Sequence, residues 1–263
     1  MAADIPGLAT MDRLEKRIET TECGHSKFGY RTTGEPDAED LHLALSKACS
    51  DLLKVLRAEH ERLPFHDIFL GKKNQNVGVA VMDPFRAQLV YEEIPTTHSA
   101  RALMAYILDL LHDVLDKTYD IARQNMVIGD VVILRSYPYG NHQETHLDMN
   151  VHQWGQEFNK SPLFGLLALQ DNTSLCLNVD ATEHFREHAT TTGYDVPLYK
   201  ARILELRINQ GEGLLMKAEC AHFGPGYKRL NFRIHFSLTP EIIDEYELDP
   251  DTVHTSEVVF FPN

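Results

Sequence analysis

The stretch RLNFRIHF, residues 229–236, alternates polar and apolar side chains without a break. A period of two is the pattern of a β-strand, because successive side chains leave opposite faces of a sheet. One face of this strand is entirely apolar and is expected to pack in a core. The other face carries Arg229, Asn231, Arg233 and His235. This polar face points either to solvent or into a barrel, where an arginine can hold a carboxylate through two parallel hydrogen bonds.

Further short extended runs dominate the second half of the chain. Turn signals separate them at Gly129-Asp130, Asp171-Asn172-Thr173 and Gln210-Gly211. With two more runs, around His146 and after His222, they make about eight strands, the number in a jelly-roll barrel of two sheets. The six longer runs are 131–137, 163–170, 174–179, 203–209, 213–218 and 230–238.

The first half of the chain predicts two amphipathic helices. Residues 37–63 and 99–123 place apolar side chains at steps of three and four, the period of one helix face. Pro64 ends the first of these helices. Between the helices, residues 77–82 and 88–94 are rich in β-forming residues, and the turn signal Asp83-Pro84 between them predicts a strand pair.

The fold class expected from these elements is α+β with mainly β content. No linker interrupts the chain, so we expect a single domain over residues 1–263. It divides into a mixed, partly helical support region (1–128), a jelly-roll core (129–240) and a C-terminal tail (241–263). Within the core, residues 180–200 are rich in Thr, His and Glu and are expected to form an inserted loop or lid.

The composition indicates which classes of partner and which cellular compartment to expect. The net charge of -14 argues against nucleic acid, whose binders carry basic surfaces. Four cysteines lie scattered without a C-x-x-C pair, which indicates a reducing compartment. An uncharged apolar run of about 18 residues, which a membrane span needs, does not occur. We therefore expect a cytoplasmic protein without a nucleic-acid or membrane partner.

The segment SYPYGNHQETHLDMN, residues 136–150, concentrates titratable side chains as no ordinary strand requires. His146 and Asp148 stand two positions apart, so in a strand both side chains leave one face and can bind one ion. His222, just after an expected strand, is the candidate for a third ligand. Two histidines and one carboxylate with open positions suit non-haem Fe(II). An H-x-D pair also arises by chance, in which case it is a surface turn.

The spaced pattern Y-x-x-G-x-x-x-x-x-H-x-D at 137–148, followed by a distal histidine and N-x-R-x-H at 231–235, resembles the Fe(II)/2-oxoglutarate-dependent dioxygenases. The resemblance covers about residues 131–238. It implies a double-stranded β-helix core of the jelly-roll, cupin-like type, with N-terminal helices packed on it. It also implies three iron ligands: His146, Asp148 and His222.

The same resemblance implies that 2-oxoglutarate binds beside the iron. Arg233 would pair with its distal carboxylate, and Arg229 is the alternative on spacing. Tyr137 would donate a hydrogen bond to the same carboxylate, with Asn231 beside it.

The activity implied is oxidation of a C–H bond by Fe(II), 2-oxoglutarate and O2, with succinate and CO2 as co-products. The expected substrate is a small molecule such as an amino acid or a natural-product intermediate. The alternatives are a hydroxylase of a protein or peptide side chain, and a cupin-like metal-binding protein that is not an oxygenase. Candidate substrate contacts are Tyr139, His142, Asn150, His152, Trp154 and Arg207.

Overall fold

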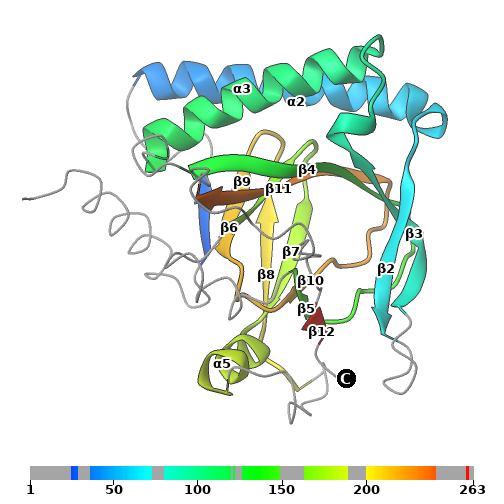
Figure 1. Cartoon of the computed structure of the whole chain (residues 1–263), viewed down its shortest axis with the longest axis vertical. Coiled ribbons are helices and arrows are strands. Elements are labelled where there is room, and N and C mark those ends of the chain that lie inside the picture. Colours follow the sequence, from blue (N-terminus) through cyan, green and yellow to red (C-terminus); the bar gives the residue numbers. More distant parts are fainter. Residues whose placement is uncertain are drawn as a thin grey trace, which may run out of the picture.

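The computed structural model describes residues 25–28, 36–72, 80–119, 121, 126–148, 163–188, 200–240 and 259–260. Two antiparallel sheets lie face to face, and two long helices run across the outside of the larger sheet (Figure 1). Residues from both sheets line the pocket that holds the candidate site.

Seven strands of the described chain form the larger sheet, in the order β1-β9-β6-β11-β4-β3-β2. Every neighbouring pair is antiparallel. The strands are β1 (His25–Phe28), β2 (His66–Lys72), β3 (Ala80–Val90), β4 (Met126–Ser136), β6 (Leu163–Ala168), β9 (Gly213–Lys217) and β11 (Asn231–Pro240).

The smaller sheet has five described strands in the order β12-β5-β10-β7-β8. They are β5 (His146–Leu147), β7 (Thr173–Asn178), β8 (Ile203–Ile208), β10 (His222–Phe223) and β12 (Val259–Phe260). The eight strands β4 to β11 are split evenly between the two sheets, and the chain crosses repeatedly from one to the other. This winding is the double-stranded β-helix, so the predicted jelly-roll core is confirmed.

The helices pack on the apolar face of β11. They are α2 (Pro36–Glu59) and α3 (Ser99–Tyr119), with the short 3-10 turns η1 (His60–Arg62) and η2 (Tyr91–Glu93). Met104 and Leu111 of α3 lie in one buried cluster with Phe232 and Ile234 of β11. Because β11 alternates, this packing turns its polar face into the barrel.

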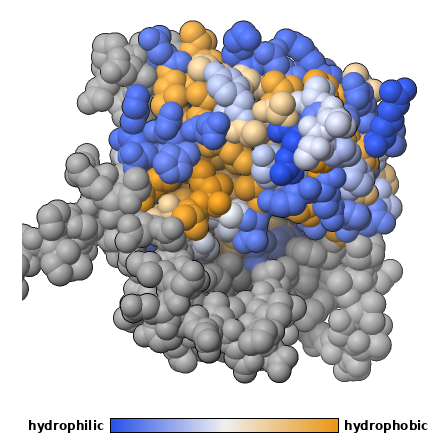
Figure 2. All heavy atoms as spheres, turned by 45° about the horizontal axis from the view of Figure 1, so that its top comes forward, coloured by the Kyte–Doolittle hydropathy of each residue, from blue (hydrophilic) through white to orange (hydrophobic). Residues whose placement is uncertain are grey.

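The helical side of the molecule carries mostly hydrophilic side chains, with hydrophobic ones between them (Figure 2). Leu43 of α2 is a large hydrophobic side chain that is 63% exposed. No helix among the described residues combines the length and the apolar composition that crossing a membrane requires.

The strand pair expected on either side of Asp83-Pro84 is wrong. The structure has one continuous strand there, β3, which pairs with β2 and β4. Ile68 of β2 lies opposite Asp83, and Asp67 lies opposite Ala87, so residues 84–86 form a bulge. Proline lacks an N–H and is tolerated where the ladder needs none, which explains why it bends this strand without ending it.

The expected loop at 180–200 begins as a helix. Residues Val179–His188 form α5, and the amide of Ala181 donates to Asn178 Oδ1 (3.0 Å), which caps the helix N-terminus. Residues 189–199 lie outside the described part of the chain.

A buried histidine of helix α2 makes the stability of the fold depend on pH. His42 of α2 is 5% exposed, and its Nδ1 has no hydrogen-bond partner among the described residues. Burial lowers the pKa of His42 below its usual 6.5. As the pH falls below 6.5, the unfolded chain therefore takes up this proton before the folded one does, and stability is lost.

We expect His42→Leu to remove this loss. In urea denaturation, the free energy of unfolding of the variant relative to wild type should be higher at pH 5 than at pH 8. A relative stability that is the same at both pH values would contradict the lowered pKa of His42.

Candidate active site

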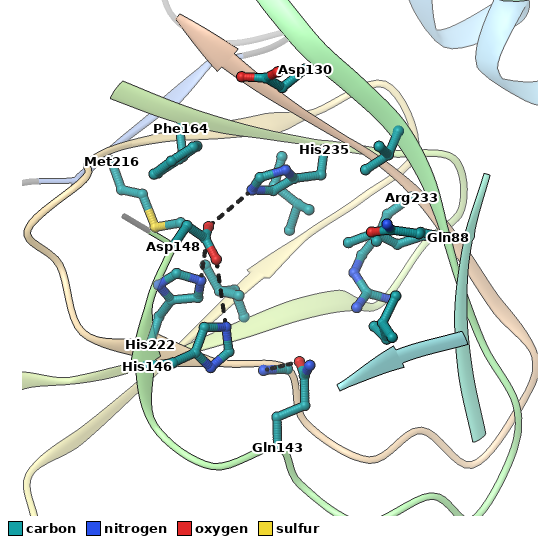
Figure 3. Close-up of a pocket in the computed structure, with 16 residues that line it drawn as sticks. Gln88, Asp130, Gln143, His146, Asp148, Phe164, Met216, His222, Arg233 and His235 are labelled. Atoms are coloured by element: carbon teal, nitrogen blue, oxygen red, sulfur yellow. Dashed lines mark hydrogen bonds and ion pairs between the residues drawn. The ribbon is translucent and has the colours of Figure 1, made fainter. Parts of the chain in front are cut away.

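Two histidines and one aspartate come together on two neighbouring strands of the smaller sheet, β5 and β10. His146 of β5 lies directly opposite His222 of β10 in the antiparallel register, and their ring centroids are 4.7 Å apart. Asp148 follows β5, with its Oδ1 3.6 Å from His146 Nε2 and its Oδ2 3.4 Å from His222 Nε2. One ligand atom from each residue lies within 4.8 Å of the others (Figure 3). The arrangement fits a metal ion.

The main chain orients both rings for this role. His146 Nδ1 donates to the carbonyl of Glu144 (2.7 Å), and His222 Nδ1 donates to the carbonyl of Cys220 (2.9 Å). Because a carbonyl only accepts, the proton of each neutral ring sits on Nδ1. The lone pair of each Nε2 then faces the carboxylate, as in histidine metal ligands.

The charge states also suit a cation. Burial, followed by the neighbouring His222, lowers the pKa of His146 to about 4, so this ring is neutral at neutral pH. Burial alone would raise the pKa of Asp148, but His222 and His235 outweigh it and hold that pKa well below 3.8. Asp148 Oδ2 is buried and has no well-aligned hydrogen bond within the described chain. Burial alone would lower the pKa of His222, but the Asp148 carboxylate outweighs it and raises that pKa above 6.5, so a metal cation at this site would replace a proton on His222.

Arg233 supplies a second charged group to the same pocket. Its side chain is 2% exposed, and Nη1 donates to Ser136 Oγ (2.9 Å) and Asn231 Oδ1 (3.4 Å). The ring of Tyr227 lies 5.5 Å from the guanidinium carbon. No carboxylate of the described residues forms an ion pair with Arg233. Burial, and then the nearby Arg86, lowers the pKa of Arg233, so an outside anion would relieve an unfavourable charge.

The pocket that joins these groups has a volume of about 320 Å³. The three candidate metal ligands lie on one side of it and Arg233 on another (Figure 3). The apolar part of the pocket wall includes Phe164, Leu166, Leu175 and Met216. Arg229, the alternative to Arg233 on spacing, is exposed and does not line this pocket.

Arg86 ties together the two segments that carry the candidate ligands. It is buried in β3 and forms an ion pair with Asp83, which is also buried. Its Nη2 donates to three main-chain carbonyls, those of Asn141 (2.7 Å), Gly224 (3.1 Å) and Pro225 (2.8 Å). One guanidinium therefore fixes the chain before His146 and after His222.

The expected role of Tyr137 is contradicted. Its hydroxyl donates to Glu61 Oε1 (2.6 Å) on the helical side. Ser136 lies opposite Asn231 in the register and points at Arg233, so the next side chain leaves the other face of β4. Ser136 therefore stands where Tyr137 was expected. Asn231 does contact Arg233, and its Nδ2 donates to Thr173 Oγ1 (3.1 Å).

The candidate substrate contacts fall in two groups. Tyr139 is 82% exposed, His142 packs edge-on against Phe223, and Arg207 pairs with Glu205 on β8; none of the three candidates lines the pocket. The other three, Asn150, His152 and Trp154, lie outside the described residues.

Two site residues were missed at the level of sequence. His235 Nε2 lies 3.2 Å from Asp148 Oδ2, and Gln143 Oε1 accepts from the amide of Gly224 (3.1 Å) inside the pocket. For His235 the signal was available, because it follows Arg233 on the same strand face.

Comparison with known proteins adds a relation of fold. No protein-family model matches the sequence, and no curated protein matches it. Among solved structures, SnoN, a non-haem α-ketoglutarate-dependent epimerase from nogalamycin biosynthesis, is 8% identical with a TM-score of 0.52, over 88% of this chain and 84% of SnoN. HygX from Streptomyces hygroscopicus, with nickel and 2-oxoglutarate bound, is 13% identical with a TM-score of 0.49, over 100% and 97%. A prolyl hydroxylase from Trichoplax adhaerens is 10% identical with a TM-score of 0.48, over 91% and 96%.

The class defined here is that of double-stranded β-helix proteins with a His-Asp-His trio between their sheets. SnoN shares the fold of this chain.

Proposed function

We propose that the protein is an Fe(II)- and 2-oxoglutarate-dependent oxygenase. The observation that carries the proposal is the presence, in one pocket, of a His-Asp-His trio and a buried arginine without a carboxylate partner among the described residues. A molecule with a metal-chelating keto acid at one end and a carboxylate at the other matches both. 2-Oxoglutarate, or α-ketoglutarate, is such a molecule, and SnoN depends on it.

The donor set supports iron as the metal. Two neutral imidazoles and one carboxylate form the face that suits non-haem Fe(II) and leave positions open for a chelating co-substrate and O2. His146, Asp148 and His222 would hold the ion. When bound, Fe(II) supplies oxygen activation coupled to the conversion of 2-oxoglutarate to succinate and CO2.

Arg233 would bind the distal carboxylate of the co-substrate. Its planar guanidinium can pair with both carboxylate oxygens, and the bonds to Ser136 and Asn231 hold it in place. Leu134 lies opposite Arg233 in the register of β4 and β11 and also lines the pocket, and its apolar side chain would exclude water around this pair and so strengthen it.

The pocket supports a small-molecule substrate. Its volume of about 320 Å³ is near the lower end of the roughly 300–1,000 Å³ typical of small-ligand sites. We propose that the enzyme oxidises a C–H bond of such a molecule, and that a peptide is the less fitting alternative.

Metal binding is the first test. Fe(II) or Ni(II), added anaerobically at 100 times its dissociation constant, should stabilise the wild type by about 2.7 kcal/mol, because the metal binds only the folded chain. His222→Ala should lose this stabilisation, as seen by thermal unfolding. The matched control is His142→Ala, which changes an exposed histidine outside the pocket. Equal stabilisation of both variants would contradict the proposed ligand set.

A further inference from the structure

His235 is a histidine of the pocket to which the proposed function gives no role. It is 19% exposed, and its ring stacks on Phe164 with centroids 5.4 Å apart and an angle of 26°. Its Nε2 lies 3.2 Å from Asp148 Oδ2. In Figure 3 the ring points at the Asp148 carboxylate from the side of β11.

The contact is with the carboxylate and is separate from the trio itself. The three atoms that lie within 4.8 Å of one another come from His146, Asp148 and His222. His235 adds a contact to this group at Asp148 Oδ2, the oxygen that also faces His222 Nε2 (3.4 Å), while Oδ1 faces His146. A carboxylate whose second oxygen accepts a hydrogen bond is fixed in orientation and presents its other oxygen to a metal.

Strand β11 carries both His235 and Arg233 into the pocket. Arg233 and His235 are alternate residues of β11 on the face that lines the pocket. Alternate side chains of a strand stand roughly 6.5–7 Å apart along its axis. One rigid element thus sets the spacing between the anion site and the metal ligand Asp148.

We propose that His235 is a positioning residue for the metal centre. When a metal fixes the carboxylate, His235 donates its Nε2–H to Asp148 Oδ2, which otherwise has no well-aligned hydrogen bond within the described chain, and leaves Oδ1 to bind the metal, so that Asp148 uses one coordination position and not two. The additional open position is available to the co-substrate. The inference rests on the proposed function, because it takes Asp148 as a metal ligand.

The test is Ni(II) binding to the full chain, measured by calorimetry without any turnover. We expect His235→Ala to weaken Ni(II) binding by about 10- to 100-fold, the usual effect of removing a hydrogen-bond partner of a metal ligand. His235→Gln, whose amide N–H can reach the same oxygen but which ligates metals poorly, should restore most of the affinity. His235→Phe keeps the stacking on Phe164, lacks the donor and should behave like alanine.

The outcomes separate this inference from the proposed function. If the wild type binds no Ni(II), Co(II) or Fe(II), both are overturned. If the wild type binds Ni(II) and the Ala and Phe variants bind it equally well, the role of His235 is overturned alone. If Gln is as weak as Ala and Phe, donation to Asp148 is overturned in favour of direct ligation by His235.

A spectroscopic measurement adds a readout that packing does not move. The Co(II)-loaded wild type and Gln variant should share one visible d–d spectrum, and the Phe variant should differ because its Asp148 is free to bind through both oxygens. Identical spectra for wild type and Phe would overturn the positioning role. The Gln and Phe pair carries the test even where alanine fails to fold.

Discussion

Replacement of Arg233 by alanine is expected to weaken 2-oxoglutarate binding by on the order of 2–5 kcal/mol. The guanidinium is 2% exposed and lacks a carboxylate partner within the described chain, so the co-substrate would be its counter-charge. Truncation leaves the incoming carboxylate desolvated without a partner. The dissociation constant should be measured anaerobically by calorimetry on metal-loaded protein.

Arg229→Ala is the matched control, since Arg229 is exposed and lies just before the same strand. Its affinity for 2-oxoglutarate should equal that of wild type. Arg233→Lys should fall between wild type and Arg233→Ala, because lysine keeps the charge without the planar fork. An unchanged affinity in Arg233→Ala would remove Arg233 from the binding site.

Arg86→Ala is expected to lower the free energy of unfolding by about 3–5 kcal/mol. The substitution leaves Asp83 as a buried, unpaired carboxylate and takes the donor from the carbonyls of Asn141, Gly224 and Pro225. Because these carbonyls fix the chain beside His146 and His222, metal affinity should fall as well. Urea denaturation measures the first effect and calorimetry the second.

Two variants serve as controls for Arg86. Arg57→Ala changes an exposed arginine of α2 and should stay within about 0.5 kcal/mol of wild type. Replacing both members of the pair, Asp83→Asn with Arg86→Met, should cost less than Arg86→Ala alone, since no uncompensated charge remains buried. A loss below about 1 kcal/mol in Arg86→Ala would show that the pair does not hold these segments.

The alternation of polar and apolar residues along the sequence predicted much of this fold, because the fold depends on which side chains are apolar. The alternation at 229–236 indicated a strand with one apolar face, and the structure packs that face under α2 and α3. The same parity favoured Arg233 as a residue facing the barrel and placed His146 and Asp148 on one side of their strand. Each of these inferences needs only the geometry of a single element.

The errors arose where the answer depends on long-range pairing. Spacing put Tyr137 near the pocket, but the register of β4 against β11 decides that Ser136 faces inward. Asp83-Pro84 has the sequence of a turn, but in the structure β3 continues through it. Residues 84–86 of β3 form a bulge where this strand pairs with β2. His235 stood on the correct face, yet its contact with Asp148 appears only when the two sheets come together.

The most direct test of oxygenase function is the conversion of 2-oxoglutarate to succinate. The purified protein is loaded with Fe(II) and 2-oxoglutarate without oxygen, O2 is then admitted, and succinate is quantified by mass spectrometry. We predict succinate that requires Fe(II), O2 and the intact protein, and that is lost in His222→Ala and Arg233→Ala. A folded wild type that forms no succinate, even uncoupled from a substrate, and binds no 2-oxoglutarate would contradict the proposed function.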